Sequence, residues 1–337
     1  MVCFRTRRLA AGLFVFSVLL GACGKKDEGK GAGGAGGASA VDNKDLDTIP
    51  VESDVVLSVD LAQAQQSALF REQVQPMMTR SGDLQKVTEL LKTKCNLDPM
   101  TAATRLTAGI KLLDGRNADV VAVLHGIEKA KAMPCLDQLK AELAAEKVEV
   151  TTDGDVVMLK GGGADLAFTF TGDKTAVVVL GPKANKAGVL EAAAGKSPLR
   201  TSKAFTEMYS RIQTSHTAWA LVRGDADLVR KNLDRLSVRA DAIYGSAKVT
   251  DGLELHGQIR VQTEEQATNL RDLIRNQSKL FETMAEKLEI EADKTDVRTT
   301  VVFTQAQVKS LVGLVRTLTG RRPRRADPPA EPPAESP

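Results

Sequence analysis

The chain has 337 residues, in which 46 lysines and arginines nearly balance 43 aspartates and glutamates. Three of the bases, Arg5, Arg7 and Arg8, lie at the very start, and without them the two signs are equal in number. The rest of the chain therefore has no basic excess to attract nucleic acid, and its 4% aromatic content offers few rings for stacking bases or sugars.

Residues 1–22 have the parts of a secretory signal. The basic start MVCFRTRR is followed by the apolar run LAAGLFVFSVLLGA. This run is shorter than the about 20 residues that a membrane-spanning helix needs, and it ends in small residues. We therefore expect residues 1–22 to be a signal peptide that is removed on export.

The end of this segment carries a motif for lipid attachment. Leu20, Gly21, Ala22 and Cys23 resemble the lipobox of bacterial lipoproteins, in which an aliphatic residue and two small ones precede a cysteine. In that family the cysteine sulfur receives a diacylglycerol, the chain is cleaved before it, and the new amine is acylated. The resemblance implies that acylated Cys23 anchors the protein in membrane lipid, since each buried methylene contributes about 0.8 kcal/mol. Gly24, in place of aspartate, implies the outer membrane.

The two ends of the mature chain have compositions that do not favour packing. Residues 23–44 are rich in glycine and alanine and are expected to form a flexible, lipidated tether that spans about 25 Å. Residues 321–337 hold six of the twelve prolines, so we expect a disordered Pro/Arg-rich tail. The folded part is expected between these two segments.

Two cysteines remain for the folded part once Cys3 leaves with the signal and Cys23 is lipidated. Cys95 and Cys135 are expected to form a disulfide, because exported proteins fold in an oxidising compartment. The alternative is two separate buried thiols. Their spacing is not that of a metal site.

The search for chemistry finds no catalytic, cofactor-binding or metal-binding residue. The three histidines, His125, His216 and His256, are scattered without a ligand pattern. The segment AAAGKSP (192–198) ends like a phosphate loop, but Leu190 stands where that loop requires glycine. Nucleophile-elbow and zinc-protease motifs are missing from the sequence. We therefore expect a protein that is not an enzyme, although spacing alone leaves open a site assembled from distant residues.

The body is predicted to have an α+β fold. Strand-like runs such as DVVLSVDLA (54–62) and ADVVAVLHG (118–126) alternate with helical runs, and Asp-Gly turns indicate hairpins. Such a pattern favours mainly antiparallel sheets packed against helices. Trp219, Phe168 and Phe170 lie in apolar strand-like runs and are expected in the core.

A recurring order of elements suggests a duplication. A strand, a glycine and a helix occur around Gly126 and again around Gly224, and the turns at Gly154 and Gly252 are related in the same way. Both pairs are separated by 98 residues. We read this as duplicated strand-helix-hairpin units that superpose near this offset.

The duplication leads to a prediction about domains and binding. Residues 45–180 are expected to form the first α+β unit and residues 181–320 the second. Because concave sites tend to form where similar units meet, any binding site is expected at their junction.

The segment IPVESDVVLSVDLA (49–62) resembles the opening of uncharacterised lipoproteins of diderm bacteria, a likeness that implies no activity. The expected function is a non-catalytic binding or scaffolding role for an outer-membrane lipoprotein that faces the periplasm, with an envelope protein or an apolar ligand as partner and no nucleic acid. Two alternatives stay open. One is an envelope-polymer hydrolase with paired carboxylates of shifted pKa, and the other is a purely structural spacer.

Overall fold

The computed structural model describes residues 44–76, 82–113, 117–161, 165–233 and 238–319. The expected signal peptide, Cys23, nearly all of the tether and the Pro/Arg-rich tail lie outside the described residues, so the predictions made for them are not addressed by the fold.

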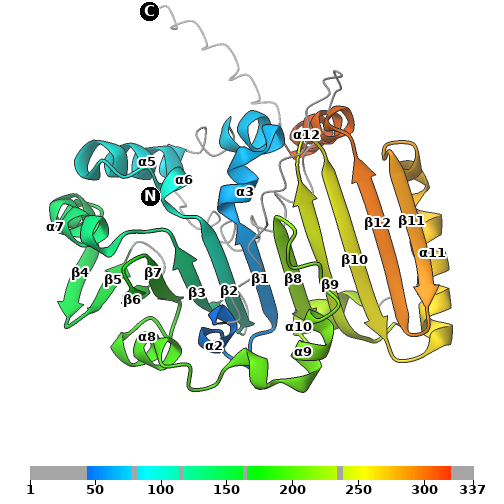
Figure 1. Ribbon diagram of the computed structural model, residues 1–337, viewed down its shortest axis with the longest axis horizontal. Helices are drawn as coiled ribbons and strands as arrows, with labels where there is room; N and C mark the ends of the chain where they lie inside the picture. The colour runs from blue at the N-terminus through cyan, green and yellow to red at the C-terminus, as the bar shows by residue number, and fades with distance from the viewer. Residues whose placement is uncertain (1–43, 77–81, 114–116, 162–164, 234–237, 320–337) are drawn as a thin grey trace, which may run out of the picture.

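Twelve antiparallel strands form one sheet in the order β11-β12-β10-β9-β8-β1-β2-β3-β7-β6-β5-β4 (Figure 1). The strands are β1 (Val55–Asp60), β2 (Arg105–Leu112), β3 (Ala118–His125), β4 (Val148–Asp153), β5 (Val156–Gly161), β6 (Leu166–Gly172), β7 (Thr175–Leu180), β8 (Ala218–Arg223), β9 (Ala240–Val249), β10 (Leu253–Val261), β11 (Lys287–Asp293) and β12 (Asp296–Phe303).

Helices surround this sheet, and together with it they confirm the predicted α+β class. They are α2 (Asp45–Thr48), α3 (Leu61–Gln66), the π-helical turn η1 (Phe70–Val74), α5 (Gly82–Cys95), α6 (Pro99–Ala102), α7 (Lys129–Ala145), α8 (Lys186–Ala193), the 3-10 turn η2 (Leu199–Thr201), α9 (Lys203–Tyr209), α10 (Asp227–Leu233), α11 (Glu264–Glu282) and α12 (Gln305–Thr319).

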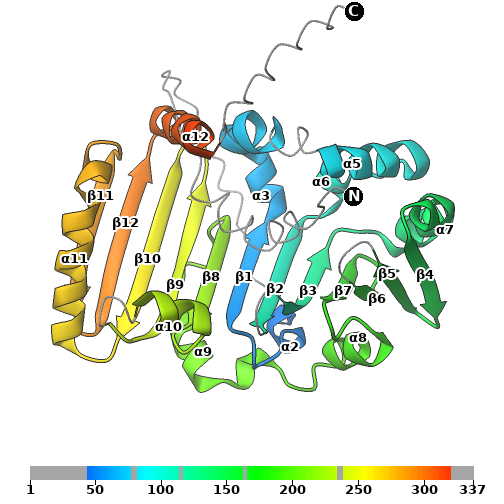
Figure 2. The same ribbon diagram turned by 180° about the vertical axis from the view of Figure 1, so that it is seen from behind.

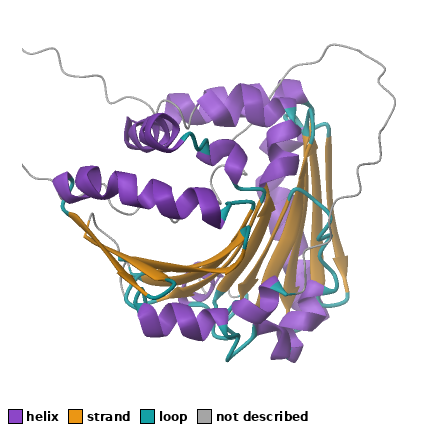
Figure 3. Ribbon diagram, turned by 60° about the vertical axis from the view of Figure 1, so that its left-hand side comes forward, coloured by secondary structure: helices purple, strands orange, loops and turns teal. Residues whose placement is uncertain are grey.

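Different helices cover the two faces of the sheet, because side chains alternate between faces along each strand. In the main core, four helical segments pack against one face of the sheet. These segments are α2, α8, η2 and α9, and the strands that they cover are β1, β3, β5, β6, β7, β8 and β9. Val56, Val179 and Val189 are almost fully buried in this core. On the other face, α12 packs over β10 and β12, and α11 packs over β10, β11 and β12. Figure 3 shows helices on both sides of the curved sheet.

A buried polar contact fixes the first described helix, α2, to the sheet. The Asp45 side chain is 3% exposed and accepts a hydrogen bond of 2.8 Å from Thr107 Oγ1. His125 Nε2 lies 2.8 Å from the other oxygen of the same carboxylate, and the hydroxyls of Thr107 and Ser58 are 3.1 Å apart. Because a buried carboxylate is costly unless it is paired, these contacts hold α2 where the expected tether ends.

The aromatic residues expected in the core have different surroundings. Trp219 is buried at 3% exposure, and its ring contacts that of Tyr209 edge to face at a centroid distance of 5.2 Å, so the prediction for Trp219 is confirmed. Phe168 and Phe170 pack edge to face on β6 at 6.0 Å and are partly exposed.

The order of elements recurs on either side of the central strands β1 and β8. In each half three strands lead outward, as β1-β2-β3 and as β8-β9-β10, and a long helix follows, α7 or α11. A later strand, β7 or β12, then returns to pair with the third. This arrangement makes β1 equivalent to β8 and β3 equivalent to β10.

The expected 98-residue offset is therefore wrong. Gly126 follows β3, the third strand of its half, whereas Gly224 follows β8, the first strand of the other. The two glycines share a local requirement instead, because neither position has room for a side chain. A Cβ at Gly126 would lie 2.4 Å from the carbonyl oxygen of Ala102, and a Cβ at Gly224 would lie 1.8 Å from the carbonyl oxygen of Ala240.

The two Asp-Gly turns also occupy different places. The turn at Gly154 joins β4 and β5 at the edge of the sheet, whereas the turn at Gly252 joins β9 and β10 inside it. Asp-Gly suits a tight hairpin turn wherever the hairpin lies, and this shared chemistry produced the apparent repeat. The division of the body into residues 45–180 and 181–320 stays a prediction.

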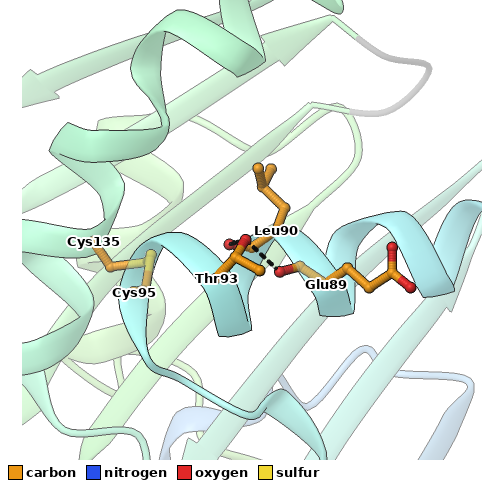
Figure 4. The surroundings of a disulfide bond; sticks show 5 residues. All are labelled: Glu89, Leu90, Thr93, Cys95 and Cys135. Carbon is orange, nitrogen blue, oxygen red and sulfur yellow. Dashed lines mark hydrogen bonds between the residues drawn. A yellow bond between two sulfur atoms is a disulfide. The ribbon is translucent and has the colours of Figure 1, made fainter.

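A disulfide joins Cys95, the last residue of α5, to Cys135 in α7, with the two Cα atoms 5.0 Å apart (Figure 4). This confirms the predicted pair. An ion pair of 2.9 Å between Lys94 Nζ and Glu142 Oε1 connects the same two helices. α5 is thus held mainly through α7, which in turn packs on the edge strand β4.

Replacing both disulfide cysteines by alanine should lower the free energy of unfolding by up to about 4 kcal/mol, because the bond closes a loop between residues 40 apart in sequence. Denaturant unfolding of the variant and of the parent protein, with and without reductant, measures this change. Reductant should lower the stability of the parent and leave the variant unchanged. Equal stability of parent and variant without reductant would contradict the prediction.

Candidate ligand-binding cavity at the central seam

The two halves of the sheet meet where β1 pairs with β8, a contact that we call the central seam. The register runs without interruption from Val55 opposite Val222 to Val59 opposite Ala218. A cavity of about 870 Å³ lies beside this seam and is bounded by β1, β8, β9, η2, α9 and α10. Figure 2 shows α9 and α10 beside the lower ends of β8 and β9.

The inner wall of the cavity is apolar. It is formed by side chains of the main core and of the segments that approach the seam: Val56, Leu199, Phe205, Met208, Leu221, Val229, Val238 and Ala242. All of these residues are buried, so the packed interior of the protein shapes this wall. The volume lies within the range of about 300–1,000 Å³ that is usual for small-molecule sites.

Charged side chains lie at the outer part of the same cavity. Arg223 Nε and Nη2 donate to the two carboxylate oxygens of Asp225 at 3.0 and 2.6 Å. This hydrogen bond, with the charge of Arg223, lowers the pKa of Asp225, and the pKa of Arg223 is raised in turn. Arg230, Arg239 and Asp241 also line the cavity. The site thus combines an apolar interior with a rim that carries both signs of charge.

A network of ion pairs holds α9 in place over the second half of the sheet. Asp296, on β12, is 4% exposed and accepts from Arg260 Nε and Nη2 at 2.9 and 2.7 Å and from Arg211 Nη1 at 2.9 Å. Glu207 of α9 accepts from Arg260 Nη1 at 2.7 Å and from Arg211 Nη2 at 3.1 Å. Because α9 supplies part of the cavity wall, this network positions the site.

Burial acts to raise the pKa of Asp296, but the hydrogen bonds from Arg260 and the charges of Arg260 and Arg211 outweigh it, so the net pKa is lowered. The same contacts raise the pKa of Arg260. A carboxylate of this kind stabilises the fold above the pKa that it has in the unfolded chain, and the stabilisation is lost as the pH falls through the lower, folded pKa.

The sheet has a second notable surface on the face opposite the main core. Ala220, Leu57, Ala108, Ala122, Val178 and Phe168 lie directly opposite one another in a row across six strands. The apolar cluster around this row consists of strand residues in the described part of the chain, and many are partly exposed: Val59, Leu106, Ile110, Val120, Leu124, Leu166, Phe168, Leu180 and Ala220. We call it the apolar face.

The structure places the three histidines in two different settings. His125 belongs to the contact that holds α2. His216 and His256, which the sequence analysis left apart, have ring centroids 5.3 Å from each other. Burial and the neighbouring His256 lower the pKa of His216. Within the described residues, no group of three or more His, Cys, Asp or Glu side chains is arranged around a metal position.

Shifted carboxyl groups elsewhere in the described chain are held as carboxylates by neighbouring bases. Hydrogen bonds from lysine lower the pKa of Glu72, Glu128 and Glu142. The glycine of the GKS segment, Gly195, has φ +60° just after α8, a turn position rather than a phosphate loop. In the described part of the chain, no helix has the length and apolar character needed to cross a membrane.

Comparison with known proteins identifies no family model and no curated protein that matches this chain. Among solved structures, crystal form III of TP0453 is similar, with a TM-score of 0.53 and 10% sequence identity over 80% of this chain and 97% of that one. Crystal form I of TP0453 gives a TM-score of 0.49 at 10% identity over 82% of this chain and 99% of that chain. The first likeness shows a shared fold.

Replacing Asp296 by asparagine should lower the free energy of unfolding at neutral pH by about 3–5 kcal/mol, because it leaves Arg260 and Arg211 without their buried counter-charge. The loss relative to the parent should shrink as the pH falls below 3.8, the ordinary carboxyl value, towards the lower folded pKa. Denaturant unfolding of the variant and the parent between pH 2.5 and 7 measures this loss. Asp225→Asn, a substitution at an exposed position, serves as the control. A loss independent of pH would contradict the assigned role.

Proposed function

We propose that this chain is a lipid-anchored protein of the bacterial envelope with a non-catalytic binding role, and that the cavity at the central seam holds an apolar ligand. The observation that carries the proposal is the cavity itself. Its inner wall is built from buried aliphatic and aromatic side chains, among them Val56, Phe205 and Leu221, and its volume suits a small molecule.

The ligand class follows from the chemistry of this wall. A polar ligand would lose its hydration against Met208, Leu221 and Ala242 without gaining hydrogen bonds there, whereas an apolar ligand gains from removal of its surface from water. The rim pair Arg223 and Asp225 remains in contact with solvent and suits a polar end of the same ligand. The proposed ligand is therefore apolar over most of its length.

The anchor is proposed from the lipobox, Leu20 to Cys23. Acylation of Cys23 would place the body on a membrane surface, with residues 24–44 as the spacer before α2. We propose the outer membrane, with the body facing the periplasm. In this compartment the disulfide between Cys95 and Cys135 is stable, which supports export.

Replacing Cys23 by serine should abolish lipidation and leave an uncleaved or soluble precursor, because serine lacks the thiolate that attacks the lipid donor. Labelling of cells with radioactive palmitate, followed by membrane fractionation, measures the effect. Cys95→Ala is a matched control, since it removes a cysteine that the proposal does not lipidate. Continued labelling of the Cys23→Ser protein would overturn the proposed anchor.

Replacing Ala204, an exposed residue of α9 that lines the cavity, by tryptophan should fill space that a ligand needs. Binding of cis-parinaric acid, a fluorescent apolar probe, should weaken by about tenfold or more if the probe occupies this cavity. Ala141→Trp, at an exposed position of α7 away from the cavity, should bind the probe as the parent does. Fluorescence titration of the three proteins measures the difference.

The apolar face is a second candidate surface for the ligand, because its row of side chains crosses six strands without a polar residue. Leu180→Glu places a charge there at a partly exposed position at the end of β7. If Leu180→Glu abolishes probe binding and Ala204→Trp does not, the ligand lies on the apolar face and the seam cavity is not its site. If neither variant changes binding, the proposed binding role at both surfaces is wrong.

A further inference from the structure

A second cavity lies on the sheet beyond the end of α9. It has a volume of about 490 Å³ and is bounded by β9, β10, β12 and the segment that follows α9. The described residues that line it include two arginines, Arg211 and Arg298, and no aspartate or glutamate. Because guanidinium groups only donate hydrogen bonds, such a lining favours a ligand that is rich in acceptors.

The floor of this cavity is polar. Two adjoining rows of side chains form it, and each row crosses β9, β10 and β12: Tyr244, Gln258 and Arg298 in one, Ser246, His256 and Thr300 in the other. Residues two apart on a strand point to the same face of the sheet, so both rows face the cavity. The floor ends at β8, where Leu221 lies opposite Tyr244 and belongs to the main core.

Hydrogen bonds within the floor decide which atoms remain for a ligand. The Tyr244 hydroxyl donates to Gln258 Oε1 at 3.0 Å, which assigns the other end of the amide as its nitrogen. Within the described residues, that nitrogen has no hydrogen bond. Ser246 and Thr300 each have one histidine contact, at 3.0 and 3.4 Å, and a hydroxyl can make further bonds. The floor therefore offers an amide donor between two hydroxyls.

Arg211 is a donor whose position is fixed before a ligand arrives. Its Nη1 donates to Asp296 at 2.9 Å and its Nη2 donates to Glu207 at 3.1 Å, which uses two of the five N–H groups of the guanidinium. Burial raises the pKa of Tyr244 and the charge of Arg211 opposes this rise, so the guanidinium lies near the phenol at the floor. A donor that is already held loses little freedom on binding.

Arg298 supplies a charge that can change partner. Its Nη2 pairs with Asp293 at 2.7 Å, and the two side chains are 49% and 48% exposed. Ion pairs this exposed contribute little to stability, because water solvates both charges. Glu291 lies opposite Arg298 on β11 but does not line the cavity. Arg298 can therefore turn towards an anion in the cavity, and its planar guanidinium matches two oxygens of one oxyanion.

We propose that this cavity binds a polyol that carries an oxyanion, of which a sugar phosphate is a simple example. Arg298 and Arg211 hold the phosphate oxygens, and Gln258, Ser246 and Thr300 bind the hydroxyls of the polyol. The volume suits a ligand larger than bare phosphate, since sites for whole small molecules usually span about 300–1,000 Å³. The site shares no lining residue with the seam cavity, so it is independent of the apolar ligand proposed there.

The test titrates the full chain in detergent with glucose 6-phosphate, glucose and inorganic phosphate by calorimetry. One glucose 6-phosphate per chain should bind, about tenfold or more tightly than glucose or phosphate alone, because it engages both the arginines and the floor. Arg298→Gln should weaken this binding by about tenfold or more, and Arg298→Lys by less, since lysine keeps the charge without the paired donors. Arg200→Gln is the matched control, because Arg200 is a similarly exposed arginine that pairs with Asp47 and lines neither cavity.

Two further variants separate the floor from the arginines and this site from the seam cavity. Gln258→Ala should weaken binding of glucose 6-phosphate more than that of phosphate, and Ala204→Trp should change neither. Circular dichroism establishes that the variants are folded. The proposal is overturned if the parent does not bind glucose 6-phosphate, if glucose binds equally tightly, or if Arg200→Gln loses as much affinity as Arg298→Gln. It is also overturned if Ala204→Trp abolishes binding, which would place the phosphate in the seam cavity.

Discussion

The pairing of β1 with β8 is the contact on which the rest of the structure depends. It joins strands separated by more than half of the folded chain and makes one sheet of what would otherwise be two smaller ones. Features on both faces of the sheet depend on this pairing. One carries the seam cavity, with Val56 and Leu221 from the paired strands in its wall, and the other carries the apolar row through Leu57 and Ala220.

The segment between β7 and β8 converts this pairing into a site. α8 packs back onto β5, β6 and β7, whereas α9 is tied to β10 and β12 through Glu207, Arg211 and Asp296. The chain therefore crosses the seam on one face with its ends fixed to opposite halves. A cavity that is bounded in this way depends on buried charges as much as on apolar packing, which is why Asp296 matters to a site that it does not line.

Local chemistry made much of this fold predictable from the sequence. The α+β class followed from alternating strands and helical stripes, and the hairpin turn from Asp153-Gly154. The disulfide followed from the two cysteines that remain for the folded part once Cys3 and Cys23 are assigned to the predicted signal and anchor. The offset of the repeat was wrong for the same reason, since glycines such as Gly126 and Gly224 report a local close approach and not a position in the sheet. Local signals do not identify which strands become neighbours.

The candidate sites depend on that missing information. Asp296 and Arg211 are 85 residues apart, and nothing in either neighbourhood marks them as partners. His216 and His256 lie side by side because β9 stands between β8 and β10, and their spacing along the chain does not reveal this. The cavity likewise draws on segments from Val51 to Gln262 and has no sequence signature.

The order of the strands has a consequence for a chain that is synthesised with its N-terminus first. β1 emerges early and can pair with β2, and the bond between Cys95 and Cys135 can close soon afterwards, but β8 follows β1 by about 160 residues. During that interval one edge of β1 has no neighbour, and contacts so distant in sequence form slowly. The first half must therefore remain unaggregated, with an open hydrogen-bonding edge on β1, until the second half arrives.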